Sequence, residues 1–100
     1  MTRKPSHPGA LIRNVILPET GITVSELAEY CGVARNTMSK IVNERGDITD
    51  DLAIRLSRVL GSTPRFWLGM QANLNLWILE QEYKHVYKAM ERIPVRSSVR

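Results

Sequence analysis

A short run of the chain, residues 35–45, is rich in side chains that donate hydrogen bonds. Arg35 and Asn36 are adjacent, and Lys40 follows five positions after Arg35. Arg can donate two hydrogen bonds to the acceptors of guanine, Asn can pair bidentately with adenine, and Lys can reach guanine or a phosphate. This pattern predicts contacts with base edges in the major groove of double-stranded DNA, if one element presents the three side chains together.

Other polar residues nearby are better suited to phosphate than to bases. They are Thr37, Ser39, Asn43 and Arg45 in the same segment, and Thr23 and Ser25 at the expected N-terminus of the preceding helix, where the helix dipole favours anions. An ordinary solvated face would contain the same residue types. The sequence leaves both interpretations open, above all for Ser25, Ser39 and Arg45.

Two short helices within residues 23–43 are expected to hold these side chains. Thr23 and Glu26 have the spacing of a capping box, which begins the first helix, and Gly32 ends it. Ala34 stands where a capping Ser or Thr would usually begin the second helix. The small and apolar residues that a helix-turn-helix requires are Ala28, Val33, Met38 and Ile41. In such a motif the second helix enters the major groove.

Three further helices are predicted around this motif, which gives an all-α fold of five helices. The first follows Pro8 and ends before Pro18, with residues 19–22 as a turn, and its apolar face consists of Leu11, Ile12, Val15 and Ile16. The fourth covers residues 50–60, between Thr49 and Gly61, and leaves Arg55 and Arg58 pointing outward. The last begins at Pro64, and Phe66, Trp67, Met70 and Leu74 are expected to close the core.

The C-terminal helical pattern is unusually long, because no Pro interrupts residues 65–93. We expect either one long helix or two with a break near residues 69–75, where weak helix formers gather. A second apolar stripe repeats by threes and fours: Leu76, Leu79, Tyr83, Val86, Met90 and Ile93. This stripe predicts a dimer or partner interface, and the alternative is packing back onto the same domain.

These patterns divide the chain into four parts. Residues 1–6 are a flexible basic arm, 7–75 a helix-turn-helix DNA-binding domain, 76–93 a C-terminal helical extension and 94–100 a tail. The arm and the tail contribute Arg3, Lys4, Arg96 and Arg100 to a net charge of +4. This charge suits a nucleic-acid binder, although a solvated surface is compatible with it as well.

Composition excludes several other classes of protein. The 100 residues contain no apolar run long enough to span a bilayer, so we expect a soluble cytoplasmic protein with no membrane contact. Cys31 is interpreted as a small buried hydrophobe, and His7 and His85 lack partners at metal-ligand spacing. No metal, cofactor or enzyme activity is predicted.

Several marks along the chain together resemble a known family. They are His7-Pro8-Gly9, the motif over residues 23–43, Arg45-Gly46-Asp47-Ile48-Thr49, and the stretch from Gly61 to Leu68 followed by Gln71. The chain resembles the HigA antitoxins, also called the VapI or addiction-module antidote family, of the lambda-repressor-like helix-turn-helix group. The family usually has Glu at the positions of Ala10 and Arg65 and Asn at that of Gly69, so this member is more basic.

The resemblance implies a specific function. A HigA antitoxin is one half of a bacterial type II toxin-antitoxin system: it binds and neutralises a HigB toxin, a RelE-like mRNA-cleaving enzyme, and as a homodimer binds operator DNA to repress its own operon. The alternative is a stand-alone helix-turn-helix transcriptional regulator without a toxin partner.

Overall fold

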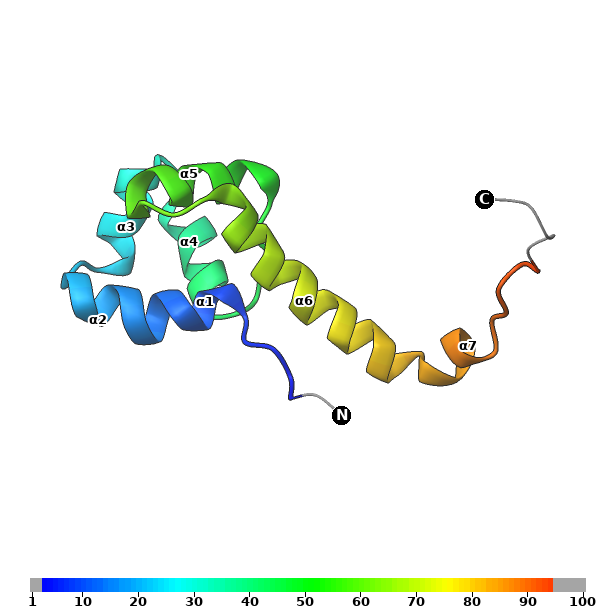
Figure 1. The fold of residues 1–100 in the computed structure, drawn as a ribbon. Coiled ribbons are helices and arrows are strands. Elements are labelled where there is room, and N and C mark those ends of the chain that lie inside the picture. Colours follow the sequence, from blue (N-terminus) through cyan, green and yellow to red (C-terminus); the bar gives the residue numbers. More distant parts are fainter. Residues whose placement is uncertain (1–2, 95–100) are drawn as a thin grey trace.

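Every regular element within residues 3–94, the part of the chain that the computed structural model describes, is a helix. In chain order these are α1 (Pro8–Leu11), η1 (Ile12–Ile16), α2 (Leu17–Thr20), α3 (Val24–Cys31), α4 (Arg35–Val42), α5 (Asp50–Leu60), α6 (Pro64–Glu82) and α7 (Lys84–Lys88). Since α1, η1 and α2 run on from one another, the predicted all-α fold with five helices is confirmed, with α7 as a short addition. Figure 1 shows α1 to α5 gathered at one end, with α6 leading away from them.

The first helical segment continues past Pro18, so the prediction that it ends before this residue is wrong. A π-helical stretch, Ile12–Ile16, precedes the proline, and the Leu17 N–H donates to the Ile12 carbonyl, five residues back. Pro18 then falls in the first turn of α2, where a missing N–H costs no hydrogen bond. The segment ends at Gly21, whose φ of 74° only glycine adopts readily. The predicted turn at 19–22 is thus shorter, and Val15, expected in the core, is 40% exposed.

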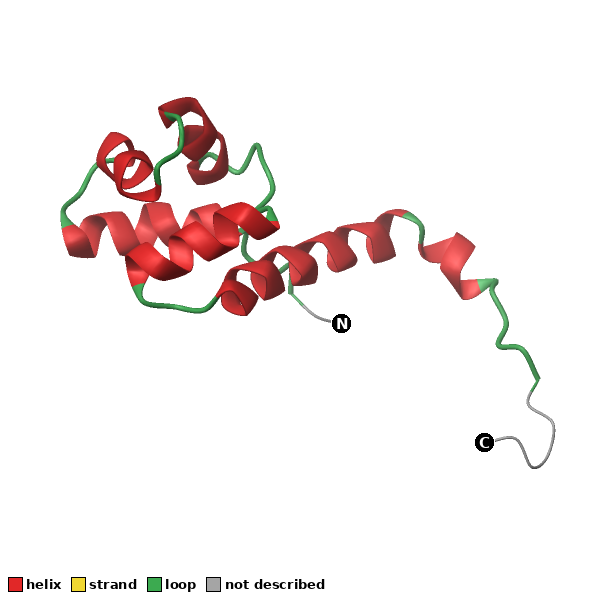
Figure 2. Cartoon of the chain, turned by 90° about the horizontal axis from the view of Figure 1, so that it is seen from above, coloured by secondary structure: helices red, strands yellow, loops and turns green. Residues whose placement is uncertain are grey.

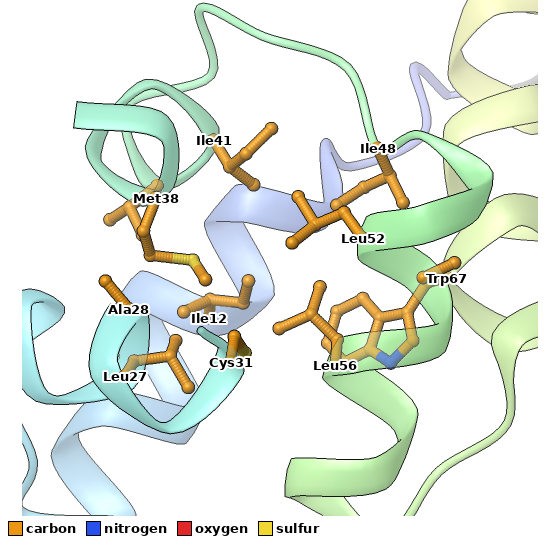
Figure 3. Packing of buried hydrophobic residues seen from close by; sticks show 12 residues of the cluster. Ile12, Leu27, Ala28, Cys31, Met38, Ile41, Ile48, Leu52, Leu56 and Trp67 are labelled. Atoms are coloured by element: carbon orange, nitrogen blue, oxygen red, sulfur yellow. The ribbon is translucent and has the colours of Figure 1, made fainter. Parts of the chain in front are cut away.

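The core lies where α1, η1, α3, α4, α5 and the first half of α6 meet (Figure 3). Its largest fully buried apolar side chains, apart from Pro8, are Ile12, Leu27, Met38, Leu56 and Trp67. The Trp67 indole N–H donates to the Ser62 hydroxyl at 2.7 Å, so burial leaves no donor unpaired there.

Two of the four residues expected to close the core do not enter it. Trp67 and Leu74 are buried as predicted, whereas Phe66 is 45% exposed and Met70 is half-buried. The Phe66 ring instead packs edge-on against Trp67, with centroids 5.1 Å apart. Gln71 takes a buried place, because its amide makes hydrogen bonds that an apolar residue could not.

α6 is a single helix without a break at residues 69–75, and it ends at Glu82 rather than at Ile93. Tyr83 leaves the helical conformation, and the five-residue α7 follows. The radius of gyration is 17.9 Å, against about 13 Å for a compact domain of this length. Figure 2 shows the reason: the second half of α6 and α7 project from the helical cluster.

The predicted extension, residues 76–93, is therefore not folded back on its own domain. Leu76, Leu79, Tyr83, Val86, Met90 and Ile93 are between 43% and 84% exposed. Packing back onto the domain, the alternative for this stripe, is thus wrong, while a dimer or partner interface stays a prediction. Residues 1–2 of the predicted arm and 95–100 of the predicted tail, with Arg96 and Arg100, lie outside the described residues. Among the described helices, none has the length and apolar content to cross a bilayer.

Candidate nucleic-acid interface

The predicted capping box begins α3. The Glu26 N–H donates to the Thr23 hydroxyl at 3.1 Å, and the Thr23 N–H donates to the Glu26 carboxylate at 2.8 Å. Gly32 ends the helix with φ 71°, as its place in the sequence predicts. Ala34 precedes α4 without any side-chain capping bond, also as predicted. The two helices of the motif therefore begin and end where local sequence signals place them.

α4 has a buried face and an exposed face, which separates its scaffold residues from its candidate contact residues. Met38, Ile41 and Val42 are buried against the core. The exposed residues are Arg35, Asn36, Thr37, Lys40 and, just past the helix, Asn43 and Arg45, whereas Ser39 is half-buried. The three predicted base readers thus share one accessible helix.

The side chains of the candidate interface make hydrogen bonds with one another. The Arg35 Nε–H donates to the Ser25 hydroxyl on α3 at 2.6 Å, and the Asn43 amide donates to the Ser39 hydroxyl at 3.3 Å. Thr23 is exposed, but its hydroxyl already accepts the capping bond. Ser25 and Arg35, predicted for separate roles, are therefore brought together by the fold.

Two arginines from flanking helices bind the C-termini of both motif helices. Arg13 donates to the Val42 carbonyl at the end of α4 at 2.6 Å and pairs with Glu44 at 2.9 Å. Arg55 donates to the Cys31 carbonyl at the end of α3 at 2.8 Å. A cation at a helix C-terminus satisfies orphan carbonyls and the negative end of the dipole. Arg55, expected to point outward, keeps a side chain that is 41% exposed, but its guanidinium lies against the end of α3 rather than extending into solvent.

Sequence reasoning missed Arg13, because its partners lie 29 and 31 residues away along the chain. The local signal in the sequence is that Glu44, and not a glycine, follows the end of α4. Glu44 has φ 62°, the left-handed conformation that glycine usually takes after a helix. Backbone N–H groups after α4 bond the carbonyls of residues 39–41, and Arg13 supplies the partner of the Val42 carbonyl.

The His7-Pro8-Gly9 motif fixes α1 against the end of α4. The His7 Nδ1 accepts from the Gly9 N–H at 2.9 Å, so Nε2 carries the proton that it donates to the Gly46 carbonyl at 3.0 Å. A Cβ on Gly9 would lie 1.8 Å from the Ile41 carbonyl oxygen. Gly9 therefore permits a backbone contact that holds α4 in place.

Gln71 anchors the loop that follows α4. Its Oε1 accepts from the Ile48 N–H at 2.8 Å, and its Nε2 donates to Asp47 at 3.3 Å and to Asn75 at 3.1 Å. Because Gln71 is buried on α6, these bonds tie the loop to a helix that itself packs on α5. This contact gives a physical reason for the Gln that the family resemblance includes.

The state of the Cys31 thiol follows from its burial. Burial of Cys31 raises the pKa of its thiol, and the nearby Arg55 charge offsets this only in part. The thiol therefore stays protonated and buried at neutral pH, as the interpretation of Cys31 as a small hydrophobe requires. Within residues 3–94, no group of three His, Cys, Asp or Glu side chains is arranged to hold a metal ion.

Comparison with known proteins places this arrangement in a family. Residues 12–67, more than half of the chain, match the family described as Helix-turn-helix. Antitoxin HigA-1 of Vibrio cholerae is 40% identical over 86 residues, which cover 86% of this chain and 81% of that protein. The chain belongs to the HigA-type antitoxins of the helix-turn-helix family. An uncharacterised HTH-type transcriptional regulator of Haemophilus influenzae is 41% identical over 80 residues, covering 80% of this chain and 75% of its relative.

A solved structure of the same type extends the likeness to three dimensions. The antitoxin GraA in complex with its operator is 34% identical to this HigA-type chain, with a TM-score of 0.85 over 95% of this chain and 97% of GraA. The likeness therefore includes the projecting α6 as well as the helix-turn-helix. Members of this family are DNA-binding antitoxins and regulators, not enzymes.

Proposed function

We propose that this HigA-type protein binds operator DNA through α4 and represses its own operon. The observation that carries the proposal is the division of α4 into a buried apolar face and an exposed face with Arg35, Asn36 and Lys40. A helix about 10–12 Å across fits a major groove about 12 Å wide. GraA, similar over nearly the whole chain, was solved with its operator, which supports the same role here.

Each polar side chain has a role in this proposal. Arg35 reads guanine, Asn36 reads adenine, and Lys40 contacts guanine or a phosphate. The phosphate contacts are assigned to Thr37, Ser39, Asn43 and Arg45 around α4, and to Thr23 and Ser25 at the N-terminus of α3. Arg13 holds the end of α4 by its bond to the Val42 carbonyl, and Gln71 holds the loop after α4 by accepting from the Ile48 N–H.

We further propose a homodimer built on the projecting extension, residues 76–93. One helix-turn-helix makes too few contacts for tight specific binding, and two half-sites lie about 34 Å apart on DNA. Leu76, Leu79 and Tyr87 line an apolar groove on this extension, next to charged Glu80 and Lys84. Burying this surface in a symmetric contact would remove exposed apolar area from water.

A HigB-like toxin is the proposed protein client. HigA-1 of Vibrio cholerae is an antitoxin by name, and the present chain covers 81% of it. Because toxins of this group are usually basic and this chain has a net charge of +4, bulk attraction cannot drive the complex. Contact must be local and partly apolar, and it would take place in the cytoplasm, where the operon and the mRNA substrate are.

DNA binding is tested by gel shift and fluorescence anisotropy with the upstream promoter fragment. Replacing Arg35 or Asn36 by Ala should cost about 1–3 kcal/mol each and relax sequence choice, and Arg45→Ala should reduce the salt slope by about one. Arg58→Ala, at an exposed position of α5, is the control for loss of one positive charge. Equal losses for Arg35→Ala on operator and random duplex would contradict its role as a reader.

The two protein contacts need separate tests. Sedimentation should give twice the 11.4 kDa chain mass for the wild type, and Leu79→Glu should shift it towards the monomer without unfolding α1 to α5. Co-expression with the neighbouring small reading frame should yield a co-purified complex that no longer cleaves mRNA. If no such frame or complex is found while operator binding persists, the protein is a stand-alone transcriptional regulator.

A further inference from the structure

Arg35 does not extend freely from α4, because its Nε–H donates to the Ser25 hydroxyl on α3 at 2.6 Å. Both side chains are exposed, so burial does not force this contact. The first-turn capping bond at the start of α3 is accepted by Thr23, not by Ser25.

The hydrogen bond divides the donors of the guanidinium into two sets. Arg has one N–H at Nε and two at each terminal nitrogen, Nη1 and Nη2. With Nε occupied by Ser25, the two terminal nitrogens remain for two parallel hydrogen bonds to the O6 and N7 acceptors of guanine. The side-on approach, which uses Nε and one terminal nitrogen, is blocked while this bond is intact.

We propose that Ser25 is a positioning residue that aims Arg35 at a guanine, rather than only a phosphate contact. This inference rests on the proposed operator binding. A long side chain loses rotamer freedom when it binds, and a partner that already holds it in the bound direction removes part of that loss. Ser25 therefore acts on base discrimination through Arg35, which a phosphate contact alone would not do.

The test compares discrimination at one base pair across a set of variants. Selection from a randomised duplex library with wild type and with Arg35→Ala identifies the G·C pair whose preference depends on Arg35. The measured quantity is the dissociation constant of the duplex without this pair divided by that of the duplex with it. We expect Ser25→Ala to lower the ratio about 3- to 10-fold, with no further effect in the Arg35→Ala background. Ser25→Thr, which keeps a hydroxyl, should retain the wild-type ratio.

Ser39→Ala is the matched control, because it also removes a hydroxyl that accepts a side-chain hydrogen bond near α4, but one from Asn43. Because Ser39 is assigned to a phosphate, its loss should weaken binding to both duplexes equally and leave the ratio unchanged. An unchanged ratio in Ser25→Ala, or an equal drop when Arg35 is already absent, overturns the positioning role. A wild type that binds no duplex at low salt overturns the proposed DNA binding itself, so the two failures are distinct. Thermal melts of each variant confirm that α3 is intact.

Discussion

Two glycine-to-alanine substitutions should change stability in opposite directions. At Gly9 the added Cβ would lie 1.8 Å from the Ile41 carbonyl oxygen and 2.8 Å from its carbon. Ordinary contact is near 3.5 Å, so α1 must move from α4 by about 1.7 Å. Overpacking against backbone costs up to about 3 kcal/mol. At Gly69 a Cβ would meet no atom within 4 Å, and Ala inside a helix gains about 0.5–1 kcal/mol.

Urea unfolding followed by tryptophan fluorescence measures the free energies, and thermal unfolding measures the melting temperatures, both at one fixed protein concentration. Gly9→Ala should lower the melting temperature by up to about 12–24 °C, and Gly69→Ala should raise it by about 2–8 °C. Gly9→Ala should also weaken operator binding, because α4 loses the contact that fixes its C-terminal end. If Gly9→Ala unfolds within 1 kcal/mol of the wild type, the packing of α1 on α4 described above is incorrect.

Three further predictions concern two contacts that hold the motif and the buried thiol of Cys31. Arg13→Ala should destabilise the protein by about 1 kcal/mol in urea unfolding, since its bonds are half-exposed, and an effect below 0.3 kcal/mol would refute the cap. Gln71→Leu should cost about 1–3 kcal/mol, because the buried Ile48 N–H loses its acceptor, whereas an unchanged unfolding midpoint would show that another group replaces it. Because burial raises the pKa of the Cys31 thiol, the folded protein should lose stability as pH rises above about 9, where the thiol of the unfolded chain ionises first. Cys31→Ala should flatten this part of the plot of unfolding free energy against pH. Alkylation of the native wild type at pH 8 should be slow.

Local signals were sufficient for the elements of the motif. Thr23 with Glu26, Thr49, and Gly32 and Gly61 mark helix ends through bonds that span at most five residues, so the sequence alone predicts them correctly. The rule that a helix ends before a proline failed at Pro18, because the backbone before it forms π-helical hydrogen bonds. The π-helical stretch before Pro18 allowed the first helix to continue, and nothing in the pattern of apolar residues indicates such a stretch.

In the candidate site, the sequence predicted which residues are exposed but not which of them contact each other. Arg35, Asn36 and Lys40 were predicted as accessible residues of one helix from their 3.6-residue spacing against Met38 and Ile41, and the fold exposes them. Their role as DNA readers stays a prediction. The bond between Ser25 and Arg35 joins residues ten positions apart on two helices. It depends on the angle between α3 and α4, which the sequence pattern does not state.

The sequence by itself determined the class of fold, the two motif helices and their exposed polar face, because helix periodicity and capping act within a few residues. Only the tertiary structure decided which groups hold those helices: Arg13 and Arg55 at their C-termini, Gln71 on the loop, and Gly9 against the backbone of α4. The physical reason is that a helix end or a loop pairs with whichever group the packing brings near, and these groups lie 23 to 32 residues away in the chain.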